Sequence, residues 1–134
     1  MTTPQIIAHR GASYLAPENT LVAFRKAMEI GADGVEMDVQ KTYDNELVIH
    51  HDYMVDMHTD ISGQIYDLTM GELKALDFGS WKDAIYANER IATLQEALEL
   101  CASMEGTQVQ LELKSPLEAV SYTHLRAHET LSDL

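Results

Sequence analysis

The stretch GVEMDVQ at residues 34–40 decides the fold class of this chain. It alternates between apolar and polar residues, as a β-strand does when its two faces meet different surroundings. The apolar and polar side chains fall on opposite faces: Val35, Met37 and Val39 on one, and Glu36, Asp38 and Gln40 on the other. The pattern therefore predicts a strand with one face against a hydrophobic core and the other carrying charged groups.

A second strand and a helix are predicted before this stretch. Residues 6–8 form a short β-branched run that stops near Gly11, as in a buried parallel strand. Residues 21–28 repeat apolar side chains at helical spacing. The helix has Asn19 or Thr20 as its N-cap and a glycine, Gly31, at its end.

Two strands and two helices are predicted after residue 40. The strands lie at 47–49 and 109–114, and the helices run from the capping boxes at Thr69 and Thr93 to Leu76 and Gly106. Strands that alternate with helices predict a parallel α/β sheet.

Composition excludes several classes of protein. The 134 residues include 9 Lys and Arg against 22 Asp and Glu, which gives a net charge of -13. A chain this acidic lacks the basic surface that binds nucleic-acid phosphates. No apolar run is long enough to span a membrane, and the single cysteine, Cys101, excludes an internal disulfide. The N-terminus has no signal-peptide pattern, so we expect a cytoplasmic protein.

The C-terminal stretch has no structural period. Val120–Thr130 resembles the translation of a transposase-type sequencing adapter. We therefore expect residues 1–118 to form the native segment and residues 119–134 to be a non-native tail, which we exclude from the fold reasoning. The alternative is a genuine polar C-terminus.

Four charged clusters fall at or just after predicted strands. They are His9-Arg10, Glu36 with Asp38, His51-Asp52, and Glu112 with Lys114. The carboxyl ends of parallel strands are where α/β proteins build active sites. Carboxylates on one face repel each other unless a positive charge lies between them. Oxygen ligands favour a divalent cation, Mg²⁺ or Ca²⁺. Alternatively, the acids pair with Arg10 and Lys114 in a structural ionic network.

Histidines supply candidate acid–base groups. Imidazole has an unperturbed pKa near neutrality, which makes His9 and His51 candidates for proton transfer. His50 is ambiguous, because it and His51 point to opposite faces of a continuing strand. The guanidinium of Arg10 suits phosphate oxygens, although Arg10 could instead pair with the acids. Lys114 has the same two possible roles, as a phosphate ligand or as an ion-pair partner.

Several motifs together resemble the glycerophosphodiester phosphodiesterase family. They are Ala8-His9-Arg10-Gly11, Pro17-Glu18-Asn19-Thr20, Gly34–Val39, His51-Asp52, Leu68–Leu73 and Leu111–Lys114, in the family's order and spacing. The resemblance implies a (β/α)₈ barrel that cleaves glycerophosphodiesters to glycerol 3-phosphate and an alcohol.

The resemblance also implies roles for individual residues. Glu36, Asp38 and Glu112 match the positions that hold one divalent cation, and His9 and His51 match the acid–base pair. Arg10 matches a phosphate-contacting position, while Lys114 and Glu18 match further active-site positions, Lys114 as a second phosphate contact and Glu18 in support.

The chain departs from the family in two places and in length. Met57 stands where an Arg is usual, and Thr93 lacks the usual preceding Pro. A full barrel takes about 250 residues, so we expect the N-terminal part of a truncated barrel and an inactive fragment. Two other functions stay open: a metal-dependent isomerase or lyase acting on a phosphorylated sugar, and a non-catalytic protein that binds phosphate ligands.

Overall fold

The computed structural model describes residues 4–115 and 118–126. The elements follow in the order β1 (Ile7–His9), α1 (Leu21–Glu29), β2 (Gly34–Lys41), β3 (Leu47–Ile49), a 3₁₀ turn (Ile65–Asp67), α2 (Met70–Lys74), a second 3₁₀ turn (Ala84–Tyr86), β4 (Ala92–Thr93), α3 (Leu94–Ala102), β5 (Gln108–Ser115) and β6 (Glu118–Arg126). None of the helices in this described part combines the length and apolar character needed to cross a bilayer. The cytoplasmic location stays a prediction.

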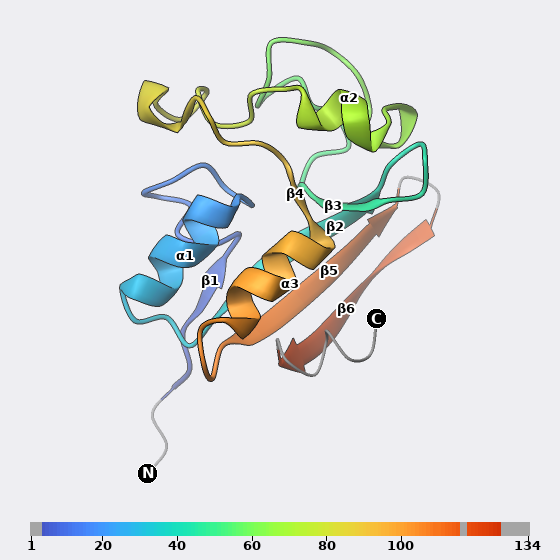
Figure 1. Cartoon of the computed structure of the whole chain (residues 1–134). Helices are drawn as coiled ribbons and strands as arrows, with labels where there is room; N and C mark the ends of the chain where they lie inside the picture. The colour runs from blue at the N-terminus through green and yellow to red at the C-terminus, as the bar shows by residue number, and fades with distance from the viewer. Residues whose placement is uncertain (1–3, 116–117, 127–134) are drawn as a thin grey trace.

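Three parallel strands form the centre of the sheet. β2 pairs in parallel with β1 along one part of its length and with β5 along the opposite edge. Helices α1 and α3 connect to these strands and lie side by side over one face of the sheet (Figure 1). Among the described residues β1 pairs only with β2, so the sheet is open. This arrangement confirms the predicted α/β class and corresponds to part of a (β/α)₈ barrel.

The third predicted strand has the expected bounds but the wrong direction. Residues 47–49 form β3, which runs antiparallel to β2, with Lys41 opposite Leu47. The turn between them contains Asn45 in the left-handed region, at a φ of 63°. A parallel connection needs a crossover of about a dozen residues or more, and this loop is far too short for one. The chain therefore folds back along β2 instead of adding a barrel strand.

The C-terminal stretch, whose sequence shows no structural period, includes a strand in the structure. Residues 118–126 form β6, which pairs antiparallel with β5 and lies beside it at the edge of the sheet (Figure 1). A (β/α) barrel places a parallel strand at that position. The rest of the predicted non-native tail, residues 127–134, lies outside the described residues.

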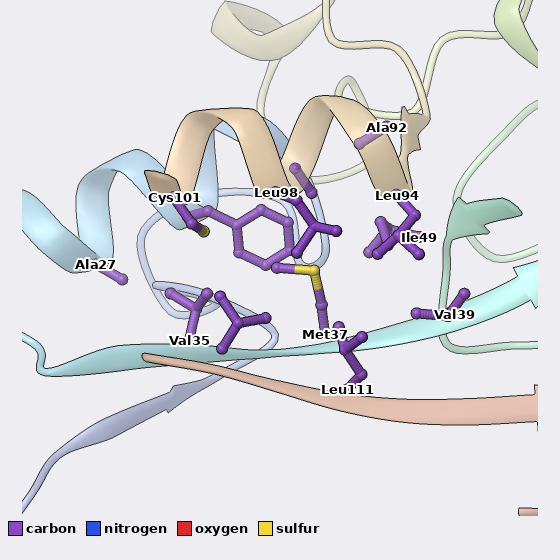
Figure 2. Close-up of a cluster of buried hydrophobic side chains, with 13 residues drawn as sticks. Ala27, Val35, Met37, Val39, Ile49, Ala92, Leu94, Leu98, Cys101 and Leu111 are labelled. Carbon is purple, nitrogen blue, oxygen red and sulfur yellow. The ribbon is translucent and has the colours of Figure 1, made fainter. Parts of the chain in front are cut away.

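The core lies between the two helices and the sheet. Phe24 of α1 and Leu98 of α3 are fully buried against the apolar face of β2. Figure 2 shows Val35, Met37 and Val39 directed toward these helices. The close packing of β2 on β5 requires glycine at position 34, because a Cβ there would collide with the carbonyl of Gln108. The alternation at residues 34–40 thus separates the core from the opposite, polar face.

The helix starts follow the sequence, and two of the helix ends do not. Thr20, rather than Asn19, caps α1, and both predicted capping boxes are present. α2 ends at Lys74 and α3 at Ala102, so both are shorter than predicted. At the end of α3 the backbone N–H of Ser103 donates to the carbonyl of Leu100, and its hydroxyl donates to the same oxygen. These bonds tighten the last turn and compete with further α-helix.

Replacing Thr93 by alanine is expected to destabilise the fold by about 1 kcal/mol, because the hydroxyl caps α3. The Thr93 Oγ1 accepts from the backbone N–H of Glu96 at 3.0 Å. Urea unfolding of Thr93→Ala beside Thr93→Ser, which keeps the hydroxyl, measures the loss. Equal unfolding midpoints for the two variants would contradict the role of the cap.

Candidate functional site

Three carboxylates meet on the polar face of the parallel strands. Glu36 and Asp38 are two residues apart on β2, and Asp38 lies directly opposite Glu112 of β5. Each residue places one carboxylate oxygen within 4.8 Å of the other two. Asp38 is fully buried and Glu36 is 6% exposed. The structure thus brings together the three predicted metal ligands.

The electrostatics of this cluster favour a cation. Burial, followed by the charge of Asp38, raises the pKa of Glu36 to about 7. The Oδ1 atom of Asp38 is buried and has no hydrogen-bond partner among the described residues. A carboxylate oxygen in that position lacks a donor or a cation to compensate its lost hydration. The set of oxygen donors fits a hard divalent cation, so a group that could hold a metal is present.

The loop after β1 brings a cation and an amide to the same cluster. Arg10 donates from Nη1 to Glu18 at 3.0 Å, and its Nε lies 3.6 Å from Oδ2 of Asp38. Asn19 donates from Nδ2 to the same Oδ2 at 2.9 Å and accepts from the backbone N–H of Asp38 at 3.3 Å. Arg10 and Asn19 both have φ near 60°. Arg10 therefore partly neutralises Asp38, as the ionic alternative expected, and remains partly exposed.

Asn19 is a site residue that sequence reasoning missed. The sequence names Asn19 as a candidate N-cap, a role that Thr20 fills, and as part of the Pro17–Thr20 motif, but gives it no role in the site. A signal existed, because asparagine is enriched in the left-handed region and its amide can bond to nearby groups. Its partner Asp38 is 19 residues away in sequence, and only the folded chain shows the pairing.

His9 and Lys114 lie at opposite sides of the cluster. His9 is the strand neighbour of Glu36, and its Nε2 is 3.7 Å from the Glu36 carboxylate. The His9 side chain is 67% exposed, so it can reach a bound molecule. Lys114 lies on β5 two residues beyond Glu112 and places Nζ 3.3 Å from its carboxylate. Both residues therefore contact predicted metal ligands.

His51 reaches the site because β3 folds back along β2. The backbone N–H of His50 donates to the carbonyl of Asp38 at 2.9 Å, which returns the chain to the level of the carboxylates. His51 lines a small cavity together with Glu18, and its Nδ1 is 2.7 Å from the carboxylate of Asp52. Both histidines line this cavity, but His50 is buried whereas the His51 side chain is 33% exposed, so His51 is the more accessible of the two and its acid–base role stays a prediction.

A cluster of aromatic rings, formed by His50, His58 and Trp81, lines this cavity. The ring of His58 is 5.1 Å from that of His50 and 4.4 Å from that of Trp81, both in edge contacts. Trp81 is 39% exposed and donates from Nε1 to the carbonyl of Phe78 at 2.8 Å. His58 and Trp81 also line a neighbouring pocket of about 360 Å³ with two aspartates, Asp60 and Asp77. Sequence reasoning missed His58.

The buried His50 predicts an acid-sensitive fold. Burial lowers the pKa of His50 to about 4 from 6.5. Below pH 6.5 the His50 imidazole binds a proton in the unfolded chain but stays neutral in the folded chain. The free energy of unfolding therefore falls between pH 6.5 and 4, by an amount of the order of 3 kcal/mol. Urea unfolding from pH 8 to 4, with His50→Gln as the comparison, should show a steeper loss for the unaltered chain. Subtracting the two curves removes the contribution of Glu36, whose raised pKa acts in the opposite direction. Parallel curves would contradict the assignment.

The fold and the site together define an α/β protein of the (β/α) barrel type with an acidic cluster on the polar face of its parallel strands. The sequence matches the Glycerophosphoryl diester phosphodiesterase family over residues 9–131, and the chain belongs to that family.

Curated relatives agree with this membership. The chain is 48% identical over 110 residues to the glycerophosphodiester phosphodiesterase of Caldanaerobacter subterraneus subsp. tengcongensis, a match that covers 82% of this chain and 45% of that protein. It is 45% identical over 97 residues to glycerophosphodiester phosphodiesterase 1 of Rattus norvegicus, covering 71% of this chain and 29% of that one.

Solved structures agree as well. A phosphodiesterase of Oleispira antarctica in complex with the product sn-glycerol-3-phosphate matches with a TM-score of 0.80 and 47% identity, over 83% of this chain and 44% of that one. The glycerophosphodiester phosphodiesterase of Agrobacterium tumefaciens matches with the same TM-score and 34% identity, over 84% of this chain and 48% of that one. The chain thus spans about half the length of these relatives or less.

Proposed function

We propose that this chain forms the part of a metal-dependent barrel enzyme that hydrolyses glycerophosphodiesters to glycerol 3-phosphate and an alcohol. The observation that carries the proposal is the cluster of buried Glu36 and Asp38 with partly buried Glu112, and with Arg10 beside it. The family membership and the product bound to the Oleispira antarctica phosphodiesterase support the same reaction.

The acidic cluster would hold one divalent cation, Mg²⁺ or Ca²⁺, through Glu36, Asp38 and Glu112. Such a cation supplies positive charge that stabilises the negative charge developing on a phosphodiester. Arg10 and Lys114 would bind phosphate oxygens, since each is held at the cluster by a carboxylate and still carries N–H donors that can turn to a ligand. Glu18 supports this by orienting the Arg10 guanidinium.

His9 and His51 would exchange the protons of the reaction. One imidazole would take a proton from the attacking hydroxyl, and the other would donate a proton to the oxygen of the departing alcohol as its bond to phosphorus breaks. Attack by water gives glycerol 3-phosphate directly, whereas attack by a substrate hydroxyl gives a cyclic phosphodiester that a water must then open to glycerol 3-phosphate. His51 is oriented by Asp52, whereas the exposed His9 can approach the substrate from solvent.

Fusing residues 1–114 to the second half of the Oleispira antarctica phosphodiesterase tests the proposal. The completed barrel should release glycerol 3-phosphate from glycerophosphodiesters in the presence of Mg²⁺ or Ca²⁺, and chelation should stop the release. Glu36→Gln in the same fusion is the matched control, because it keeps the side-chain shape and removes the charge. A folded fusion that binds glycerol 3-phosphate without any turnover would instead favour a phosphate-binding function, and turnover of a phosphorylated sugar in its place would favour an isomerase or lyase.

We further propose that the 134-residue chain by itself does not turn over substrate. In the described residues one edge of β1 is unpaired, and the three parallel strands enclose the cluster from one side only. The antiparallel direction of β6 supports a non-native origin for residues 119–134. Sequencing the native gene beyond codon 118 tests that origin, and a continuation identical to residues 119–134 would refute it.

A further inference from the structure

We propose that Gln40 and Asp52 are positioning residues for His51. Gln40 holds the turn that carries His51, and Asp52 fixes which ring nitrogen of His51 bears the proton. This inference rests on the proposed function for its significance, but its geometry and its test are independent of turnover.

Gln40 is held against three successive carbonyl oxygens. Its side chain is buried, with 2% exposure, and its Nε2 lies 2.8 Å from the carbonyl of His50, 3.3 Å from that of His51 and 2.7 Å from that of Asp52. A carbonyl can only accept a hydrogen bond, so the amide nitrogen, and not the amide oxygen, must face the turn. Both N–H bonds of Gln40 are therefore committed to residues 50–52.

Asp52 contributes two different groups to the same arrangement. Its carbonyl accepts from Gln40 and also from Nδ1 of His50 at 2.8 Å. Its carboxylate lies 2.7 Å from Nδ1 of His51. Burial raises the pKa of Asp52, but the hydrogen bond to His51 and the neighbouring histidines together lower it below its usual value. An ionised carboxylate only accepts, so Nδ1 of His51 carries the proton. Nε2 of His51 is then the ring nitrogen left to face a ligand.

Gln40, whose amide clamps residues 50–52, lies on the same strand as two of the proposed metal ligands. Glu36, Asp38 and Gln40 follow at intervals of two on β2 and share a face. The backbone N–H of His50 also donates to the carbonyl of Asp38. One extended segment thus sets the positions of the acidic cluster and of the acid–base histidine relative to each other, which preorganises the site.

Nuclear magnetic resonance of the 134-residue chain tests both parts of the proposal. Long-range ¹H–¹⁵N spectra report which ring nitrogen of His51 carries the proton, and calorimetry with Mg²⁺ or Ca²⁺ reports the acidic cluster. The variants are Gln40→Met, which keeps length and loses both donors, and Asp52→Asn, which keeps shape and loses charge. Gln95→Met is the matched control, because Gln95 is exposed on α3 and its side-chain amide donates to the carboxylate of Glu99 on the surface of the same helix.

The unaltered chain and the Gln95 variant should show a single state of the His51 ring, in which Nδ1 carries the proton that bonds to Asp52. Asp52→Asn and Gln40→Met should both lose this single state, while metal affinity changes by less than about tenfold, the lower limit typical of groups that orient ligands. A structural role alone would leave the state of the His51 ring unchanged in a folded variant. Retention of the Nδ1 proton in either folded variant would overturn the proposal. A loss of metal affinity of more than about tenfold in Gln40→Met would overturn it as well.

A measurement on the unaltered chain covers the case in which Gln40→Met does not fold. The side-chain amide protons of Gln40 should exchange with solvent much more slowly than those of Gln95. The two Gln40 protons are buried and bonded to carbonyl oxygens, whereas the Gln95 amide is exposed. Equal exchange rates for the two amides would overturn the clamp. Failure of turnover in the completed barrel with the His51 state intact would count against the proposed function alone.

Discussion

Replacing Glu36 by alanine is expected to abolish detectable binding of Mg²⁺ or Ca²⁺, with a loss of affinity of about 100-fold or more. Even groups that only orient a metal ligand cost 10- to 100-fold when removed, and Glu36 would bind the metal itself. Two effects combine here: one of three oxygen donors is lost, and so is the charge that raises affinity for a hard cation. Isothermal titration calorimetry of the unaltered chain and Glu36→Ala measures the difference.

His9→Ala is the matched control for this experiment. The His9 imidazole contacts the Glu36 carboxylate at 3.7 Å from the exposed side and is not part of the three-carboxylate cluster. Metal affinity should therefore survive in His9→Ala, while turnover of the completed barrel should be lost. Equal loss of metal binding in the two variants would contradict the separation of metal and acid–base roles.

Replacing Glu36 by glutamine predicts the sign of a stability change. The raised pKa of Glu36 means that, without metal, the folded state disfavours the ionised carboxylate. Its contribution to stability is complete below pH 4.5 and is lost as the pH rises through about 7. In a chelating buffer at pH 8, Glu36→Gln should thus unfold at higher urea than the unaltered chain, and added Mg²⁺ or Ca²⁺ should reverse the order.

Replacing Phe24 by alanine is expected to cost about 3 to 5 kcal/mol of unfolding free energy. Phe24 is fully buried at the centre of the cluster that α1 and α3 make with β2 and β5. Truncation removes the aromatic contacts and leaves a cavity that the surrounding β-strands cannot close. Since domains are stable by only about 5 to 15 kcal/mol, much of the population should unfold, which circular dichroism during urea unfolding measures.

Ile85→Ala provides the comparison for this core substitution. Ile85 is 78% exposed, and a surface substitution of this kind changes stability by only about 0.5 kcal/mol or less. A similar loss in Phe24→Ala and Ile85→Ala would show that the buried cluster does not hold the fold together.

The elements that sequence reasoning located well are those with a local cause. The strand at 34–40, the caps of α1, α2 and α3, and the stop near Gly31 all depend on neighbouring residues. The direction of β3 was wrong, because three apolar residues read the same in either direction. The end of α3 was also placed too late, since the bonds of Ser103 to Leu100 have no signal in apolar spacing.

The candidate site shows the same division. Alternation alone placed Glu36 and Asp38 on one face, and the motifs pointed to His9, Arg10 and His51. Sequence spacing could not show that Asn19 bonds to Asp38, or that Gln40 faces three carbonyls of residues 50–52. Those contacts join segments that are separated along the chain, and their partners are backbone groups that every residue type carries.

The sequence by itself determined the α/β class, the family resemblance and the identity of the charged groups, because periodicity and residue chemistry are local properties. Only the tertiary structure decided how those groups are arranged. The parallel register of β2 and β5 places Asp38 opposite Glu112, and the antiparallel return of β3 brings the backbone of His50, next to His51, against Asp38. Register and strand direction depend on hydrogen bonds between distant segments, so the burial that raises the pKa of Glu36 exists only once the sheet has formed.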